Sequence, residues 1–282
     1  MNANPQANRD QSVLWNSTGG RAWVVNQATM DRMFEPFEPI LMDALPAGAG
    51  QRVLDVGCGT GATTLAAAQR TGDQGECIGV DISAPMLALA RERAAQAGIA
   101  ARFVEADAQT HAFSPASFDR IVSRFGVMFF DDPVAAFTNL RRAARPGAAM
   151  RLVAWRSPDE NAFMTTGERA AASLLPDLPV RQPNAPGQFA FADRARVAAI
   201  LAQAGWSDVD IEPIDVACTI AEPDLIGYIG WLGSVGQRLQ TADEPLRSAV
   251  IGTVRAAFEP YVRDGMVRFT AACWRIDARA PA

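Results

Sequence analysis

The sequence predicts an α/β fold built on a mostly parallel sheet, and three observations lead to this prediction. A short apolar run at 53–56 is followed by a glycine-rich turn and then by a helix-forming run at 63–70. Further strand-like runs alternate with helical patterns as far as residue 155. Two segments of alternating apolar residues, 209–220 and 266–276, come later. Strands that alternate with helices are typical of a sheet covered by helices on its faces.

The first strand and its turn have the sequence VLDVGCGTG over residues 53–61. The strand residues around Asp55 are apolar, as in a parallel strand that is buried on both faces. Gly57, Gly59 and Gly61 permit a tight turn and a close approach of a ligand to the backbone. The backbone N–H groups of such a turn, just ahead of a helix, point toward whatever binds there.

Two kinds of nucleotide-like ligand fit this turn. Gly57, Gly59 and Ala62 satisfy the G-x-G-x-x-G/A pattern of dinucleotide sites. Asp55 argues against a pyrophosphate, because like charges repel, but it suits the sulfonium and ammonium groups of S-adenosylmethionine. With Asp55 included, the run resembles motif I of the class I S-adenosylmethionine-dependent methyltransferases. Cys58 lies inside the turn, where we expect its backbone to matter more than its thiol.

The second strand is predicted at 77–81 and ends in Asp81. An acid at this position can accept hydrogen bonds from both ribose hydroxyls of a bound nucleotide. Ser83 is the expected N-cap of the helix that follows. Ile82 and Met86 are placed to pack on an adenine ring; for Met86, a plain core position is the alternative.

The third and fourth strands are predicted at 101–107 and 118–125. The resemblance implies that Asp107 accepts a hydrogen bond from the adenine amino group and that the Ala108 backbone meets the ring. The start of the fourth strand resembles motif IV of the same family. Its end, from Ser123 to Phe125, is expected beside the methyl donor. Met128 and Phe129 follow in an apolar loop near the predicted chemistry.

The resemblance extends from Gln51 to Trp155, with four motifs in the family's order and a fifth strand at 148–155. It implies a Rossmann-like sheet of seven strands whose last strand is antiparallel. The segments at 209–220 and 266–276 fit the sixth and seventh strands, with a bulge expected at Pro213. The region from motif I to motif IV also resembles the ubiquinone/menaquinone C-methyltransferases.

Two segments outside this core are expected to cover it. Residues 1–50 read as an N-terminal helical lid, with an amphipathic helix late in the segment and a Gly19-Gly20 break. Trp15 and Trp23 flank that break and are either core anchors or parts of a flexible lid. The remaining residues, 51–282, form the core.

A helical cap is expected inside the core region at about 222–262, and it reads as two helices. Glycines recur in it at every third position from Gly227 to Gly236, which indicates either close helix packing or a broken segment that lines a pocket. Tyr228 and Trp231 lie among these glycines. They are candidates for contact with an apolar or planar substrate, or for the core of the cap.

Composition and charge narrow the classes of function. A net charge of −5 without an arginine- or lysine-rich run argues against nucleic acid as a partner. The absence of a long apolar segment and the polar first residues predict a cytoplasmic protein without a membrane span. The four cysteines lack the spacing of a zinc site, and three are expected to be buried in strands. His111 is the only histidine, so neither a metal centre nor a Ser-His-Asp triad is expected.

We therefore predict an S-adenosylmethionine-dependent methyltransferase that acts on a small-molecule O, N or C nucleophile. Holding the nucleophile in line with the sulfonium in a dry pocket can supply much of the rate acceleration. No catalytic residue is identified; a general base, if one is used, would be a carboxylate or Tyr228. An NAD(P)-dependent oxidoreductase and a non-catalytic S-adenosylmethionine-binding protein are the alternatives.

Overall fold

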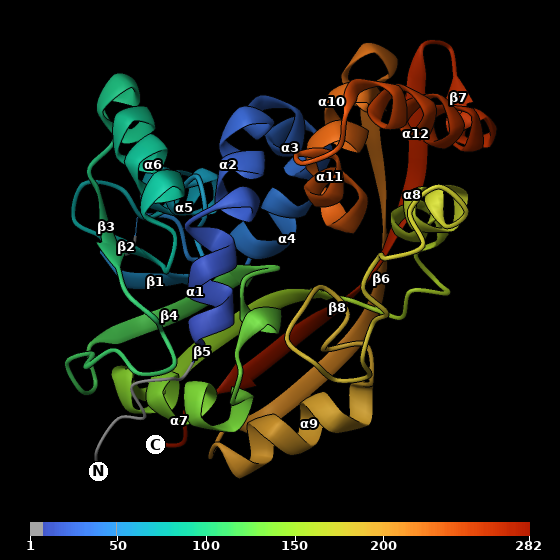
Figure 1. The fold of residues 1–282 in the computed structure, drawn as a ribbon. Coiled ribbons are helices and arrows are strands. Elements are labelled where there is room, and N and C mark those ends of the chain that lie inside the picture. The colour runs from blue at the N-terminus through green and yellow to red at the C-terminus, as the bar shows by residue number, and fades with distance from the viewer. Residues whose placement is uncertain (1–7, 49) are drawn as a thin grey trace.

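The computed structural model describes residues 8–48 and 50–282, which form one twisted sheet with helices on both faces (Figure 1). The part of the expected lid at residues 1–7 and 49 lies outside the described residues. The strands, in spatial order across the sheet, are β3 (Ala101–Glu105), β2 (Glu76–Asp81), β1 (Arg52–Val56), β4 (Phe118–Arg124), β5 (Ala144–Trp155), β8 (Met266–Arg279) and β6 (Ser207–Ala221).

The sheet is parallel except at one position. β1 pairs in parallel with β2 and β4, whereas β8 runs antiparallel between β5 and β6. A two-residue strand, β7 (Val262–Arg263), forms a hairpin with β8 through the Asp264-Gly265 turn, where both residues have positive φ. The predicted Rossmann-like sheet with an antiparallel last strand is confirmed, and β7 is the one addition.

Helices form a layer on each face of the sheet, and Figure 1 shows α5 and α6 on one side and α7 and α9 on the other. The helices that the core contributes are α5 (Ala62–Thr71), α6 (Ala84–Ala97), α7 (Pro133–Ala143), α8 (Ala162–Ala171) and α9 (Arg194–Gln203). No helix in the described part of the chain is both long and apolar enough to cross a membrane.

Local sequence explains where these helices begin and end. The Asp132 carboxylate accepts a hydrogen bond from the Ala135 N–H at 2.9 Å, and Pro133 occupies the first turn of α7. The residues of α7 that face the sheet recur at helical spacing, and Phe137 and Leu140 among them are completely buried. At the end of α6, Gly98 adopts a left-handed conformation.

The N-terminal segment differs from the expected pattern. Its described part, residues 8–48, contains four helices and one 3-10 turn, which are α1 (Arg9–Trp15), α2 (Thr18–Val25), α3 (Gln27–Phe34), η1 (Glu35–Phe37) and α4 (Glu38–Met42). The chain changes direction at Asn16 and Ser17, so the prediction of a break at Gly19 and Gly20 was wrong. Both glycines are buried inside α2. A Cβ on Gly20 would come within 2.7 Å of the Ser83 Oγ, so glycine is needed there for close packing on α6.

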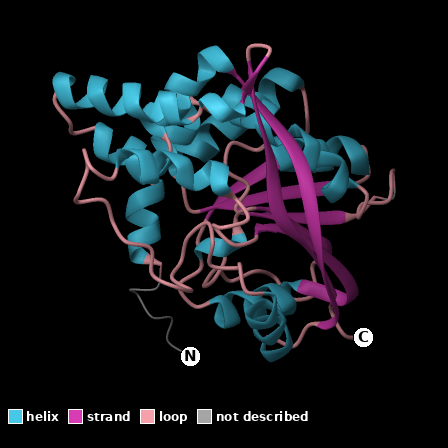
Figure 2. Ribbon diagram, turned by 90° about the vertical axis from the view of Figure 1, so that its right-hand side faces the viewer, coloured by secondary structure: helices cyan, strands magenta, loops and turns pink. Residues whose placement is uncertain are grey.

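The predicted bulge at Pro213 was also wrong. Pro213 pairs with Trp274 in an unbroken register, and the register shift lies instead between Ser207 and Asp210. The buried residues change from one face of β6 to the other after Pro213, because the strand leaves the main sheet there. Figure 2 shows the two long strands extending beyond the rest of the sheet to the top of the molecule.

The cap contains three helices and not the expected two. They are α10 (Leu225–Trp231), α11 (Gly233–Leu239) and α12 (Glu244–Ala257), with short 3-10 turns at Glu222–Asp224 and Glu259–Tyr261. The glycine-spaced segment breaks at Gly233, which has a φ of 68°. A Cβ on Gly236 would lie 2.2 Å from the backbone of Trp231, so both explanations for the glycines apply, a broken segment at Gly233 and close helix packing at Gly236.

Candidate active site

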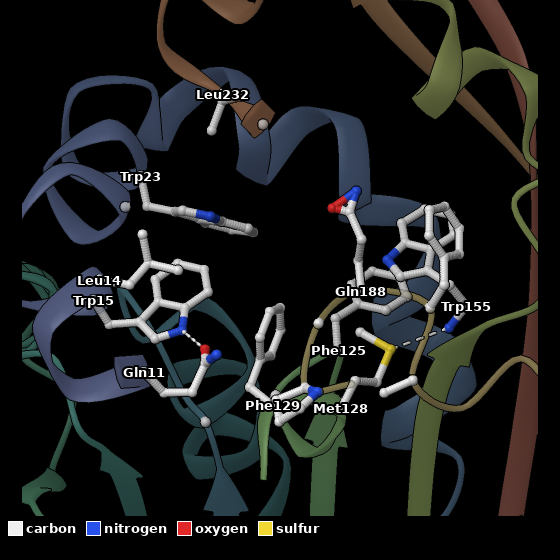
Figure 3. Close-up of a pocket in the computed structure, with 18 of the residues that line it drawn as sticks. Gln11, Leu14, Trp15, Trp23, Phe125, Met128, Phe129, Trp155, Gln188 and Leu232 are labelled. Atoms are coloured by element: carbon white, nitrogen blue, oxygen red, sulfur yellow. Dashed lines mark hydrogen bonds between the residues drawn. The ribbon is translucent and has the colours of Figure 1, made fainter. Parts of the chain in front are cut away.

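A cavity of about 840 Å³ lies at the carboxyl ends of β1, β2 and β4, where ligands of open α/β sheets bind. The N-terminal helices α1 to α3 line one side of it, and the cap lines another. A loop at 179–190 completes the wall. Figure 3 shows Trp15 and Trp23 of the N-terminal helices, Leu232 of the cap and Gln188 of the loop around one space.

The glycine turn after β1 has the backbone geometry that its sequence predicts. Gly57 and Gly59 line the cavity and have φ values of 67° and 55°. A Cβ on Gly57 would lie 2.6 Å from the Cα of Gly126, so the ends of β1 and β4 approach each other at two glycines. Gly61 also has positive φ, but it packs on Ala90 and is not part of the cavity wall.

Asp81 lies at the end of β2 with its carboxylate fixed toward the cavity. The Gly59 N–H donates to Oδ2 at 2.7 Å, and the Ser83 N–H donates to Oδ1 at 2.9 Å. Burial raises the pKa of Asp81 above its ordinary value, although these N–H donors act in the opposite direction. The two bonds hold the carboxylate in place and leave one lone pair on each oxygen for a ligand.

Asp107, just beyond the end of β3, is fastened to the N-terminal segment. The Asn8 side chain donates from Nδ2 to Asp107 Oδ1 at 2.9 Å, and the Asn8 Oδ1 accepts from the Asp131 N–H at 2.7 Å. Asn8 thus joins the loops after β3 and β4 at the edge of the cavity. No pattern in the sequence indicates this residue, because its partners lie 99 and 123 positions away.

Asp55 lies beneath the glycine turn and is not part of the cavity wall. Thr64 donates to its Oδ2 at 2.7 Å, while Oδ1 is buried without a hydrogen-bond partner among the described residues. Burial raises the pKa of Asp55 to about 7. Ser123 is likewise behind the wall, where its hydroxyl donates to the Val56 carbonyl at 2.6 Å and accepts from the Gly126 N–H.

The aromatic half of the cavity begins where β4 ends. Phe125 has a φ of 65°, which is rare for a bulky residue, and its ring stacks on Trp155 at 4.5 Å. Phe129 meets Trp15 edge to face at 5.1 Å (Figure 3). Apolar and aromatic surface therefore surrounds the space beyond the glycine turn.

The cap contributes Tyr228 and Trp231 to the cavity wall. The Tyr228 ring also packs in the cap's aromatic cluster, 5.6 Å from Phe163 and 6.4 Å from Phe258. Both readings of Tyr228, as core and as cavity residue, therefore apply. Burial raises the pKa of Tyr228, so its hydroxyl stays protonated at neutral pH and suits a hydrogen-bond donor better than a general base.

Most of the candidate residues converge on the cavity. Those in its wall are Gly57, Cys58, Gly59, Asp81, Ile82, Met86, Asp107, Ala108, Phe125, Met128, Phe129, Tyr228 and Trp231. Those outside it are Asp55, Gly61 and Ser123.

Several wall residues were not identified from the sequence. Arg124 lies in the strand end that was expected beside the methyl donor, but it was not singled out as a candidate; its position at the carboxyl end of β4 was the available signal. The others lie in the N-terminal segment, at the end of β5 or in the loop at 179–190, and their patterns do not indicate a site; they include Asn8, Gln11, Phe34, Trp155, Arg181 and Gln188.

One of the four cysteines, Cys58, lies in the cavity wall. All four cysteines are buried and unpaired, which confirms the expectation for the three in strands. Within residues 8–48 and 50–282, no group of three or more His, Cys, Asp or Glu side chains is arranged to hold a metal ion.

The glycine turn, the strand order and the antiparallel strand β8 together give the chain the Rossmann-like fold of the class I methyltransferases. Residues 53–147 match the family model described as a methyltransferase domain. This match confirms the recognition made from the motifs and identifies a methyltransferase domain in this part of the chain.

Comparison with curated proteins gives relatives of moderate identity. An uncharacterised protein of Mycobacterium tuberculosis (strain ATCC 25618 / H37Rv) is 34% identical over 157 residues, 55% of this chain and 56% of the relative. The demethylmenaquinone methyltransferase of Thermus thermophilus is 36% identical over 115 residues, 41% of this chain and 52% of the relative. The nocamycin O-methyltransferase of Saccharothrix syringae is 27% identical over 237 residues, 80% and 84% of the two chains. The chain thus spans about half the length of the first relatives.

Solved structures share the fold at low identity. The YcgJ protein of Bacillus subtilis aligns with a TM-score of 0.58 and 20% identity, over 88% of this chain and 99% of its own. Phosphoethanolamine N-methyltransferase 2 of Haemonchus contortus, in complex with S-adenosyl-L-methionine, aligns with a TM-score of 0.54 and 20% identity, over 98% of this chain and 60% of its own. These likenesses concern the fold.

Proposed function

We propose that this protein is an S-adenosylmethionine-dependent methyltransferase that methylates a planar, mainly apolar small molecule at an O, N or C nucleophile. The observation that carries the proposal is the single cavity with two chemically different ends. One end has the glycine turn and the strand-end carboxylates, and the other has aromatic side chains from the N-terminal helices, β4 and the cap. The methyltransferase family match supports the reaction class.

The residues at the polar end fit the cofactor. Asp81 has a free lone pair on each oxygen for the two ribose hydroxyls, and Asp107 is placed for the adenine amino group. The open backbone at Gly59, where a Cβ would meet only the Met86 sulfur at 3.8 Å, leaves room for the ligand at the turn. Behind the turn, the unsatisfied Oδ1 of Asp55 supplies negative charge on the side of the cationic end. When bound, the cofactor supplies an electrophilic methyl group on a sulfonium.

The residues at the apolar end would hold and orient the acceptor. Phe129, Trp15 and Trp23 offer flat surfaces for a planar molecule and exclude water from it. Tyr228 would donate a hydrogen bond to an acceptor oxygen. Orientation in a dry pocket would then bring the nucleophile in line with the methyl group.

We further propose that α1 and α2 form a lid on the cavity. Their attachments to the core near the cavity are side-chain bonds that can open together. The Asn16 amide donates to the Ile82 carbonyl at 2.8 Å and accepts from the Ala84 N–H at 2.9 Å, and Ser83 donates to the Trp15 carbonyl. Opening these few bonds would admit both ligands, in keeping with lid motions in other enzymes.

Calorimetry with S-adenosylmethionine, S-adenosylhomocysteine and NAD in parallel tests the cofactor. We expect micromolar affinity for S-adenosylhomocysteine with a raised melting temperature, and no binding of NAD. Binding of NAD alone would favour the oxidoreductase alternative. Release of S-adenosylhomocysteine, measured across a panel of naphthols, hydroquinones and aromatic amines, tests turnover. Tight cofactor binding without turnover of any acceptor would favour a non-catalytic binding protein.

A further inference from the structure

Arg124 is a half-buried cation in the cavity wall, and it has no ion-pair partner among the described residues. Its guanidinium makes one long hydrogen bond, from Nη1 to the Phe34 carbonyl at 3.4 Å. It also lies 5.7 Å from the centre of the Phe34 ring. A guanidinium offers five N–H donors, so most of its donors are unused by the protein.

Three carboxylates lie close enough for their charges to act on Arg124, but none of them neutralises its charge. Asp31 is committed to Arg93, with an Nη2–Oδ2 distance of 2.5 Å. Asp55, whose pKa burial raises to about 7, is only partly ionised at neutral pH. Glu38 is exposed to solvent. Withdrawing a charge partly from water without giving it a partner is unfavourable, so this arrangement favours a bound anion.

The strand order indicates what reaches Arg124. If Asp107 and Asp81 take the adenine and the ribose, the bound cofactor runs across the strand ends in the order β3, β2, β1 and β4. Its amino-acid end then lies at β1 and β4, where Arg124 projects into the cavity. The aromatic acceptor space adjoins the same strand end.

We propose that Arg124 is a carboxylate-binding residue of the cavity. This inference rests on the proposed function, because the proposed function supplies the orientation of the bound cofactor. The carboxylate comes either from the methionine part of the cofactor or from an acidic acceptor, and both present the same planar group. A guanidinium pairs with that group through two parallel hydrogen bonds, which a lysine cannot reproduce.

The test compares Arg124→Met with Arg124→Lys and with a matched control, Arg120→Met. Arg120 lies on the same strand, but its guanidinium donates to the Ala44 carbonyl and is outside the cavity. Calorimetry measures the binding of S-adenosylhomocysteine and of its decarboxylated analogue, which keeps the amine and lacks the carboxylate. Melting curves confirm that each variant is folded.

A cofactor carboxylate predicts one pattern. Arg124→Met should weaken S-adenosylhomocysteine by roughly ten- to a hundredfold and leave the decarboxylated analogue unchanged, with a smaller loss for Arg124→Lys. Arg120→Met should bind both ligands as the parent does. If Arg124→Met weakens both ligands equally, Arg124 has a structural role and the proposal is wrong.

An acceptor carboxylate predicts another pattern. S-adenosylhomocysteine affinity should then be unchanged in Arg124→Met, and 2-naphthoate should bind the parent but not this variant. The proposal is overturned if Arg124→Met binds both probes as the parent does. It is also overturned if S-adenosylhomocysteine affinity is unchanged in Arg124→Met and the parent does not bind 2-naphthoate. The methyltransferase assignment stands after either result. If the parent binds no S-adenosylhomocysteine at all, the proposed function fails and the 2-naphthoate result alone decides the role of Arg124.

Discussion

Asp55 combines a buried carboxylate with an incomplete set of hydrogen bonds. Burial raises its pKa from 3.8 to about 7, so the native state keeps this proton over a range in which the unfolded chain has released it. The native state therefore binds more protons than the unfolded state between about pH 4 and pH 7. In that window the contribution of Asp55 to the free energy of unfolding falls as the pH rises.

Asp55→Asn removes the titrating carboxyl group, so the free energy of unfolding should lose this fall with rising pH. In the ligand-free protein, we expect the free energy of unfolding of the variant to exceed that of the parent increasingly as the pH rises from 4 to 7. Urea unfolding at several pH values measures the difference. Thr64→Val removes the hydrogen bond that lowers the pKa of Asp55, so it should extend the fall to higher pH. A difference between Asp55→Asn and parent that does not change with pH would contradict this account.

Asp81 supports the glycine turn as well as the expected ribose site. Asp81→Ala should weaken S-adenosylhomocysteine binding by about 1.5–3 kcal/mol for each charge-assisted bond lost, at most. Because the Gly59 N–H also loses its acceptor, we expect a fall in stability of the unliganded protein too. Calorimetry and melting curves separate the two effects. Unchanged affinity in a folded Asp81→Ala protein would mean that the ribose binds elsewhere.

At the scale of single elements, the contact between α2 and α6 depends on Gly20. Gly20→Ala would place a methyl group 2.7 Å from the Ser83 Oγ and against the Trp15 carbonyl. We expect α1 and α2 to shift from the cavity at a cost of roughly 1–3 kcal/mol, with weaker cofactor binding. Gly252→Ala in α12 is the control, since a Cβ there meets nothing within 4 Å. Equal cofactor affinity in Gly20→Ala and parent would argue against the lid.

The strands and helices between residues 52 and 155 were predictable because local signals agree there. Apolar runs, glycine turns and caps such as Ser83 and Asp132 each fix a boundary without reference to distant residues. The N-terminal helices were not predictable in detail, because Gly19 and Gly20 serve close packing and do not form a turn: Gly19 packs on Leu14 of α1, and Gly20 packs on Ser83 at the start of α6. The bulge near Asp208 depends on pairing with β8, which the sequence of β6 alone does not contain.

The residues of the candidate site also divide into those that were predictable from the sequence and those that were not. Residues on motifs, such as Gly57, Asp81 and Asp107, were predictable from their places at strand ends. Asn8, Arg124 and Gln188 belong to three separate segments and become neighbours of the cavity only through the fold. Their chemistry depends on this convergence, so no pattern within any one segment indicates it.

At the scale of the whole molecule, the cavity joins segments with separable roles. The core between β1 and β4 carries the groups expected to hold the cofactor, while the cap adds groups only at the apolar end. Because β6 and β8 extend beyond the sheet, they hold the cap over the cavity as part of the same sheet that forms the core (Figure 2). Substitutions in the cap should therefore affect the acceptor and leave the cofactor site intact.

Tyr228 and Trp231 test this separation. Tyr228→Ala would open a hole in the aromatic cluster of the cap and lower stability by roughly 3–5 kcal/mol, so it does not isolate function. Tyr228→Phe keeps the ring and removes the hydroxyl. We expect it to retain the melting temperature and the affinity for S-adenosylmethionine, while turnover of an acceptor falls because the oriented hydrogen bond is lost. Trp231→Ala should likewise lower turnover more than cofactor affinity.

Tyr261→Phe is the matched control for the loss of a hydroxyl. Tyr261 belongs to the same aromatic cluster, but its hydroxyl pairs with Thr166 Oγ1 at 3.3 Å and it is not part of the cavity wall. This variant should therefore turn over the acceptor at the parental rate. Equal turnover in Tyr228→Phe and Tyr261→Phe would show that the Tyr228 hydroxyl does not contact the acceptor. A parallel loss of cofactor affinity and stability in Trp231→Ala would make that ring part of the cap's core, and the acceptor would then have to be oriented by Trp15, Trp23 and Phe129 alone.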